Sequence, residues 1–213
     1  MKVTPDLKKR AARVLALLRK AYPDAECELH GWTTPFELAV AAILSAQCTD
    51  KRVNMVTPAL FAKYRTPADW AATPQETLES EIRSTGFFRN KATNIRGLAK
   101  EVSERFGGTL PNDLDVLVTL PGIGRKTANL LVATAFGGQG IIVDTHCTRV
   151  AGRLGFTDQK DPVKIEFDLR AIVPEPDWTA WSHCMVFHGR RCCDARKPAC
   201  PRCPVAALCP SAQ

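Results

Sequence analysis

The sequence predicts an almost entirely α-helical protein, and three observations support this fold class. Apolar residues recur at helical spacing along most of the chain, capping residues precede several of these runs, and no stretch alternates polar and apolar residues over a useful length. The tripeptide Ile141-Ile142-Val143 comes nearest to a strand, but it is too short to build a sheet. We therefore expect helices packed against helices.

Size and charge limit the possible functions. The 213 residues suit one large domain or two small lobes with a buried core, and the net charge of +7 makes a polyanion a plausible partner. Five basic residues interrupt the apolar positions of the N-terminal run: Lys8, Lys9, Arg10, Arg13 and Arg19. This run is therefore neither a signal peptide nor a membrane span, and we expect a cytoplasmic protein without a membrane contact.

The first half of the chain contains several helix starts. Asp6 is expected to cap a helix that ends before Pro23. The segment Thr34-Pro35-Phe36-Glu37 is a capping box, and the run that follows is apolar nearly all round, so this helix should be central to the core. After the polar turn 45–50 another helix begins, and Thr73-Pro74-Gln75-Glu76 is expected to form a second capping box.

The second half continues the helical pattern. The glycine-marked loop 84–92 presents two phenylalanines beside two cations and leads into a helix that ends near 106–108. Asn112 or Asp113 should cap a short helix. Further helices are expected at 144–154, around 161–172, and from 178 towards 191.

A glycine-flanked turn, Pro121-Gly122-Ile123-Gly124, stands before a helix-forming run that starts at Arg125. The glycines should supply backbone conformations that other residues resist and leave the backbone N–H groups open to a ligand. N–H groups at the start of a helix form a site for phosphate. Lys126 follows directly, although the turn alone is also compatible with an ordinary helical corner and a solvated lysine.

The return of the chain suggests a partner for Lys126. Gly137-Gly138 should end the helix, and the segment 137–143 can span up to about 23 Å if extended. That length is enough to bring Asp144 back beside Lys126. A lysine and a carboxylate at a phosphate-binding turn predict an active site that works on nucleic acid.

Nine cysteines in a reducing compartment favour metal ligation or buried thiols over disulfides. Four of them follow the spacing Cys193-x6-Cys200-x2-Cys203-x5-Cys209. Thiolates in so short a loop can close around zinc or a 4Fe–4S cluster, and the single short C-x2-C pair is unusual for structural zinc. Cys192 adjoins the first ligand and competes for its place. The others are expected to be small buried residues: Cys27, Cys48, Cys147 and Cys184.

Five segments resemble, in family order, the endonuclease III branch of the helix–hairpin–helix DNA glycosylases: PFELAVAAILSAQCTD, GFFRNKATNI, LPGIGRKTAN, VDTHCTRVAGRLG and HGRRCCDARKPACPRCPVAALC. The resemblance covers nearly the full chain. It implies two helical lobes with a DNA-binding cleft between them. Residues 28–138 would form a six-helix lobe, and 1–27 with 139–213 would form the second lobe with the cluster loop. The implied partner is double-stranded DNA with a damaged base or an abasic site, bound by a monomer.

The resemblance also implies roles for single residues. Lys126 would be the nucleophile and Asp144 the second catalytic residue, and the cysteine spacing would hold a 4Fe–4S cluster. Gln47 and Phe87 match the residues that fill the gap left by a flipped-out base. The remaining expected DNA contacts are the hairpin residues Pro121, Gly122, Ile123, Gly124 and Arg125, and the basic residues Arg190, Arg191, Lys197 and Arg202.

The implied reaction is the excision of oxidised pyrimidines by a bifunctional glycosylase/AP lyase of base-excision repair. The lysine amine attacks the sugar C1′, expels the base and forms a Schiff base that permits β-elimination. Asp144 either stabilises positive charge on the sugar or relays a proton. One alternative is a monofunctional adenine-mismatch glycosylase of the same superfamily, which Lys126 argues against. Another is a non-catalytic DNA-binding module with a redox-sensing cluster, which has no need of Lys126 and Asp144.

Overall fold

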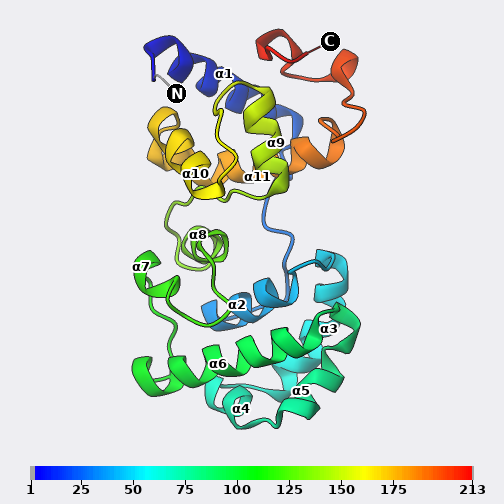
Figure 1. Cartoon of the computed structure of the whole chain (residues 1–213), viewed down its shortest axis with the longest axis vertical. Coiled ribbons are helices and arrows are strands. Elements are labelled where there is room, and N and C mark those ends of the chain that lie inside the picture. The colour runs from blue at the N-terminus through cyan, green and yellow to red at the C-terminus, as the bar shows by residue number, and fades with distance from the viewer. Residues whose placement is uncertain (1–2, 213) are drawn as a thin grey trace. The chain divides into compact units, whose positions relative to one another are not determined.

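The computed structural model describes residues 3–212, and every regular element within them is a helix. The chain divides into two compact units, Cys27–Gly138 and Met1–Glu26 together with Gln139–Gln213. In Figure 1 the first unit runs from light blue through cyan to green, and the second is dark blue at α1 and yellow-green to red after residue 138. Each unit has its own core of buried apolar side chains. Cys27, which the resemblance assigned to the lobe of the N-terminal helix, falls in the other unit.

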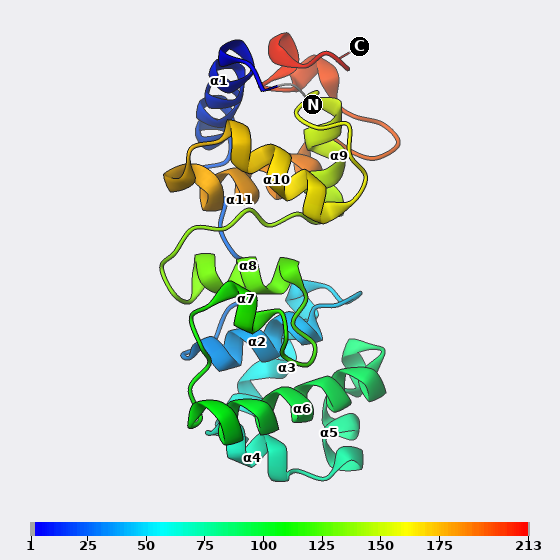
Figure 2. The same ribbon diagram turned by 60° about the vertical axis from the view of Figure 1, so that its left-hand side comes forward.

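The unit Cys27–Gly138 contains seven α-helices and one 3-10 helix, one α-helix more than the resemblance implies. They are α2 (Pro35–Leu44), α3 (Asp50–Lys63), α4 (Pro67–Ala72), α5 (Gln75–Glu81), η1 (Arg83–Thr85), α6 (Phe88–Phe106), α7 (Leu114–Leu117) and α8 (Arg125–Thr134). As its composition predicts, α2 is buried on nearly every side. It lies between α8 and α6, in Figure 1 and again in the turned view of Figure 2.

Two capping boxes start helices in this unit. Thr34 caps α2 as predicted, because its Oγ1 accepts from the Glu37 N–H at 3.2 Å and the Glu37 carboxylate accepts from the Thr34 N–H. The second box was predicted at Thr73, and this is wrong. Thr66 and Asp69 form it at the start of α4, while the Thr73 hydroxyl donates to the Asp69 carbonyl at 2.8 Å. The next helix, α5, has Pro74 as its N-cap and no side-chain capping bond.

The other unit contains α1 (Pro5–Ala21), α9 (Thr145–Arg153), α10 (Pro162–Ile172), η2 (Glu175–Asp177), α11 (Trp178–Arg191), η3 (Cys200–Arg202) and η4 (Ala206–Leu208). The predicted cap of α1 is wrong, because Thr4 rather than Asp6 accepts the capping bond, from the Leu7 N–H at 3.1 Å. Pro5 is the first helical residue, and Asp6 lies in the first turn, where a negative charge suits the helix dipole. Helix α11 packs against α9 and α1.

No helix in the described part of the chain combines the length and the apolar composition that a membrane crossing requires.

Candidate active site and cysteine centre

The glycine turn before α8 packs tightly within its unit. Gly122 has φ 75°, and a Cβ added there would lie 2.9 Å from both Asn94 Cβ on α6 and Ile43 Cδ1 on α2. Only glycine fits this position. We predicted that both glycines adopt backbone conformations that other residues resist, and this is wrong for Gly124. It has φ −82° and ψ 171°, and an added Cβ would meet nothing within 4 Å. Its backbone is extended, which any residue adopts.

The start of α8 presents backbone donors. Gly124 is the N-cap and has no side chain to accept from the first turn. The first intrahelical bond runs from the Ala128 N–H to the Gly124 carbonyl at 2.9 Å, so the N–H groups before it have no carbonyl partner within the helix. Lys126 is exposed in this first turn. The helix ends at Thr134, two residues earlier than predicted, and Gly137 follows with φ 68°.

Asp144 starts a helix in the other unit. It is the N-cap of α9, and its Oδ1 accepts from the Cys147 N–H at 2.7 Å. The carboxylate is half-buried, and its orientation is fixed by this bond. A carboxylate suits this position, because its oxygen can accept from the backbone N–H groups at a helix N-terminus. Lys126 and Asp144 therefore come from different units and stand at the starts of two different helices.

Gln47 and Phe87 lie at exposed turns of the unit Cys27–Gly138. Gln47 follows the end of α2, and Phe87 is the N-cap of α6 without a side-chain capping bond. Phe87 is 63% exposed, so its ring is not part of the core. Gln47 does not cap the next helix, because Thr49 does so by accepting from the Arg52 N–H at 3.3 Å. Both side chains therefore remain available to a ligand.

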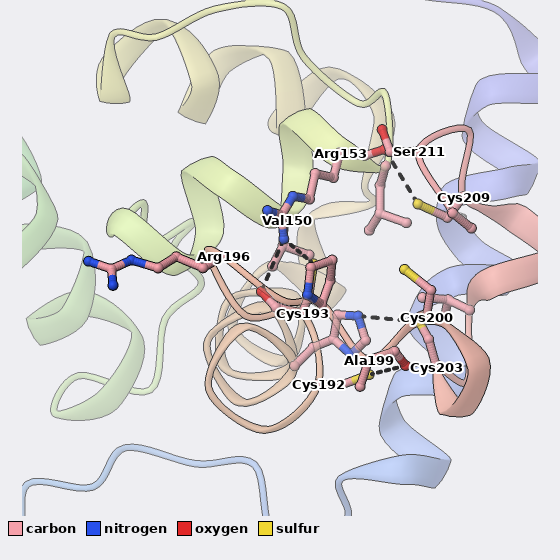
Figure 3. Close-up of a pocket in the computed structure, with 15 residues that line it drawn as sticks. Val150, Arg153, Cys192, Cys193, Arg196, Ala199, Cys200, Cys203, Cys209 and Ser211 are labelled. Carbon is pink, nitrogen blue, oxygen red and sulfur yellow. Dashed lines mark hydrogen bonds between the residues drawn. The ribbon is translucent and has the colours of Figure 1, made fainter.

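The four expected metal ligands line one cavity of about 350 Å³ at the C-terminal loop, shown in Figure 3: Cys193, Cys200, Cys203 and Cys209. Each is half-buried. A water molecule occupies about 30 Å³ in the liquid, so this cavity has room for more than a single ion. The donor set is all thiol, which suits zinc or an iron–sulfur cluster.

Arg153 organises this cavity. Its Nη1 lies 3.3 Å from the sulfur of Cys193 and donates to it, while the Cys209 thiol donates to the Arg153 backbone carbonyl at 3.5 Å. The guanidinium therefore places a cationic donor beside one of the expected ligand sulfurs. Cys192 has the opposite surroundings, because its thiol donates to the Ala199 carbonyl at 3.8 Å and burial raises its pKa to about 11.

A histidine reaches the same cavity from α11. His188, Cys192 and Cys203 present possible ligand atoms within 4.8 Å of one another. Nε2 of His188 lies 3.7 Å from the Cys203 sulfur, and its Nδ1 lies 2.9 Å from the Tyr22 hydroxyl. Burial lowers the pKa of His188 to about 4, so the ring is neutral at pH 7.

The basic residues near the cysteines are exposed but not equally available. Arg191 makes a two-bond contact with Asp24 at 3.0 and 2.7 Å and lies over the Phe187 ring. Arg202 donates to the Arg191 backbone carbonyl at 3.0 Å. Lys197 is exposed on the cysteine loop. The charge of Arg191 is thus already partly compensated within the protein. The other expected contact, Arg190, is also exposed.

The remaining cysteines match the prediction only in part. Cys147 and Cys184 are buried in the core of their unit, whereas Cys27 and Cys48 are half-buried at the edge of the other core.

The sequence did not indicate two residues that the structure makes candidates for a functional role. Lys91 is buried, and Arg153 holds the cysteine loop. Neither carries a local signal, because a lysine or arginine on a helix is usually solvated.

Comparison with known proteins agrees with these features. Residues 40–175 match the HhH-GPD superfamily of base excision DNA repair proteins. An endonuclease III of Synechocystis sp. is 51% identical over 207 residues, which cover 97% of this chain and 94% of that protein. A solved non-covalent complex of an endonuclease III with DNA is 47% identical, with a TM-score of 0.91 over 99% of this chain and 97% of that one. A trapped covalent endonuclease III–DNA intermediate gives the same identity and TM-score, over 99% and 98% of the two chains.

Proposed function

Because the chain belongs to the endonuclease III family of base excision DNA repair proteins, we propose that it removes oxidised pyrimidines from duplex DNA as a bifunctional glycosylase/AP lyase. The observation that carries this proposal is the position of Lys126, exposed in the first turn of α8 directly after the glycine turn. A relative with 47% identity has been trapped in a covalent intermediate with DNA, which requires a nucleophile on the protein. Both proposed catalytic residues belong to one chain, so a monomer can carry the reaction.

The proposed chemistry begins at Lys126. Its neutral amine attacks the sugar C1′, a bond from Nζ to C1′ forms, and the bond from C1′ to the base breaks. The base leaves with the electron pair and takes up a proton, while the amine loses one. Opening of the sugar ring gives a C1′=Nζ imine. Loss of a proton from C2′ then breaks the C3′–O bond and releases the 3′ phosphate.

We assign Asp144 the stabilisation of the positive charge that develops on the sugar when the base departs. Its Oδ1 is held by the Cys147 N–H, which supports an oriented carboxylate. A fixed negative group at a developing positive charge lowers the barrier without reorganisation.

The DNA contacts are proposed to come from three places. The turn 121–125 and the backbone donors at the start of α8 would hold a phosphate. Gln47 and Phe87 would fill the stack after the base is flipped out, which their exposure supports. The basic residues beside the cysteines would contact further phosphates: Arg190, Arg191, Lys197 and Arg202.

We further propose that Cys193, Cys200, Cys203 and Cys209 hold a 4Fe–4S cluster. The all-thiol donor set and the size of the cavity support a cluster, and the guanidinium of Arg153 orients the sulfur of Cys193. When bound, the cluster would stabilise the fold of the loop that carries the basic residues.

Borohydride trapping on DNA with an abasic site tests the proposal. Wild-type protein should form a covalent complex, and Lys126→Gln should form none while still binding DNA. Lys100→Gln is the matched control, because Lys100 is an exposed lysine in the same unit and forms a loose ion pair with Glu104 at 4.0 Å. A monofunctional glycosylase or a non-catalytic DNA-binding module would give no trapped complex with the wild type. Trapping of Lys126→Gln at the wild-type rate would mean that another amine is the nucleophile.

A further inference from the structure

Gln47 and Phe87 share an uncommon backbone conformation. In the part of the chain that the structure describes, they are the two non-glycine residues with positive φ, at 51° and 48°. A residue with a Cβ is strained there, and such strain persists only where the surrounding fold enforces it. Phe87 is 63% exposed, so burial of its ring does not enforce it.

The side chain of Lys91 connects the segments that precede the two residues. Lys91 lies in the first turn of α6 and is only 3% exposed. Its Nζ donates to the Leu44 carbonyl at 2.8 Å and to the Thr85 carbonyl at 2.7 Å. Leu44 is the last residue of α2, and Thr85 is the last residue of η1. One ammonium group therefore closes two helix ends, each just before a residue with positive φ.

The carbonyl at the end of α2 needs this partner. In a continued α-helix the Cys48 N–H would bond to the Leu44 carbonyl, but here it bonds to the Ser45 carbonyl at 3.1 Å. The turn that carries Gln47 thus leaves the Leu44 carbonyl to Lys91. A buried carbonyl without a partner is costly, so removal of the ammonium would favour a rearrangement of the turn.

The charge of Lys91 is suited to this place but costly to bury. The C-terminal end of a helix carries partial negative charge, and Lys91 lies at two such ends. Burial nevertheless lowers the pKa of Lys91, which means that the environment disfavours the cation. An apolar side chain of similar length would fill the same volume without this cost. A role in packing alone therefore does not explain a lysine here.

We propose that Lys91 is a positioning residue that holds Gln47 and Phe87 in the conformation in which both side chains enter the DNA stack. The inference rests on the proposed function, because it takes the filling of the emptied stack as the task of these two residues. Lys91 itself would not touch DNA. It would act through the carbonyls of Leu44 and Thr85.

The first experiment tests, in the free protein, whether the bonds from Lys91 to the Leu44 and Thr85 carbonyls hold the two turns; we call these two bonds the Lys91 clamp. Amide hydrogen exchange is compared between the wild type, Lys91→Met and Lys100→Met, the last being a control on the exposed face of the same helix. We expect exchange in peptides covering 44–49 and 84–88 to be faster by about tenfold or more in Lys91→Met alone, because each lost bond was made to a charged donor. Peptides from α7 and α8 should be unchanged. Equal exchange at 44–49 and 84–88, or faster exchange throughout the unit, would overturn the proposal.

The second experiment tests the consequence on DNA. The probe is a duplex in which a tetrahydrofuran abasic analogue faces 2-aminopurine, whose fluorescence rises when it leaves the stack. Lys91→Met should lose most of the wild-type fluorescence rise and keep the salt dependence of binding. In a Gln47→Ala/Phe87→Ala background, Lys91→Met should have no further effect, because the clamp acts only through these two residues. An additional loss of the fluorescence rise there would contradict the proposal.

The two experiments separate this inference from the proposed function. If the wild type fails to unstack the probe, the assignment of Gln47 and Phe87 to the DNA stack is wrong. The proposed role of Lys91 in DNA binding is then wrong as well. If the wild type unstacks the probe and Lys91→Met does so equally well, only the role of Lys91 is wrong.

Discussion

Arg153 donates a hydrogen bond from Nη1 to the sulfur of Cys193 across 3.3 Å. The same guanidinium donates to the carbonyls of Asp194 at 2.6 Å and Ala195 at 2.7 Å. One side chain from α9 therefore orients the first proposed cluster ligand and the loop that follows it. Outer groups of this kind usually matter almost as much to a metal site as the ligands themselves.

Replacement of Arg153 by methionine should lower the iron content and the visible absorbance of the purified protein, because the Cys193 sulfur and the loop carbonyls lose their donor. Arg196→Met is the control, since Arg196 lines the same cavity but is exposed and extends away from the sulfur atoms in Figure 3. Iron analysis after anaerobic purification is the measurement. Full iron content in Arg153→Met would contradict the role assigned to this arginine.

The neighbouring cysteines should respond differently to substitution. Cys192→Ser should keep its iron, because the Cys192 thiol is held neutral by burial and donates to the Ala199 carbonyl. Cys200→Ser should lose the iron and part of the helical circular dichroism signal. Zinc in stoichiometric amount with no iron in the wild type would contradict the cluster assignment, and loss of iron in Cys192→Ser would contradict the ligand set.

The basic residues should contribute unequally to DNA binding. Each phosphate contact changes the log–log salt slope of B-DNA binding by about 0.9, so Lys197→Gln should reduce the slope by about that amount. Arg191→Gln should reduce it less, because Asp24 already pairs with this guanidinium. Asp24→Asn should instead raise the affinity at low salt, since it frees Arg191. Fluorescence anisotropy at several salt concentrations measures the DNA binding of all three variants. Equal salt slopes for Arg191→Gln and Lys197→Gln would contradict the predicted difference between the two residues.

The proposed catalytic pair predicts a non-additive loss. Lys126→Gln should abolish covalent trapping, and Asp144→Asn should slow base release by about a hundredfold or more, because the developing charge loses its stabilising carboxylate. The double variant should be no worse than Lys126→Gln, since both residues serve one transition state. Asparagine also caps helices well, so urea unfolding of Asp144→Asn should match the wild type. A slow rate together with a large loss of stability would indicate a structural role.

Lys91 predicts a pH dependence of stability. Burial lowers its pKa in the folded state, so between that value and the unfolded value of about 10.4 the unfolded chain binds more protons. The free energy of unfolding of the wild type, relative to Lys91→Met, should therefore rise as the pH increases through this window. Urea unfolding of both proteins at pH 7, 8, 9 and 10 measures the difference. A constant difference over this range would contradict the predicted sign.

The residues themselves determine the local structure of this protein to a large extent. The capping box at Thr34 and the end of α6 before Gly107 follow from residues a few positions apart, because caps and glycines act on their immediate backbone. The order of the hairpin, the VDTH segment and the cysteine spacing likewise indicates the family. The local pattern misled at Thr73, which lies at the C-terminal end of α4 and donates to the Asp69 carbonyl instead of capping α5.

Tertiary structure decides the contacts that join distant segments. The ammonium of Lys91 bonds to a carbonyl 47 positions away, and the Tyr22 hydroxyl reaches His188 across 166 positions. From the sequence, Lys91 is one of two cations beside two phenylalanines, and Phe87 is compatible with a buried or an exposed position. Whether a lysine is buried and a phenylalanine exposed depends on which helix ends meet. The packing of the helices decides which helix ends lie together. No residue near Lys91 in the sequence indicates where α2 ends.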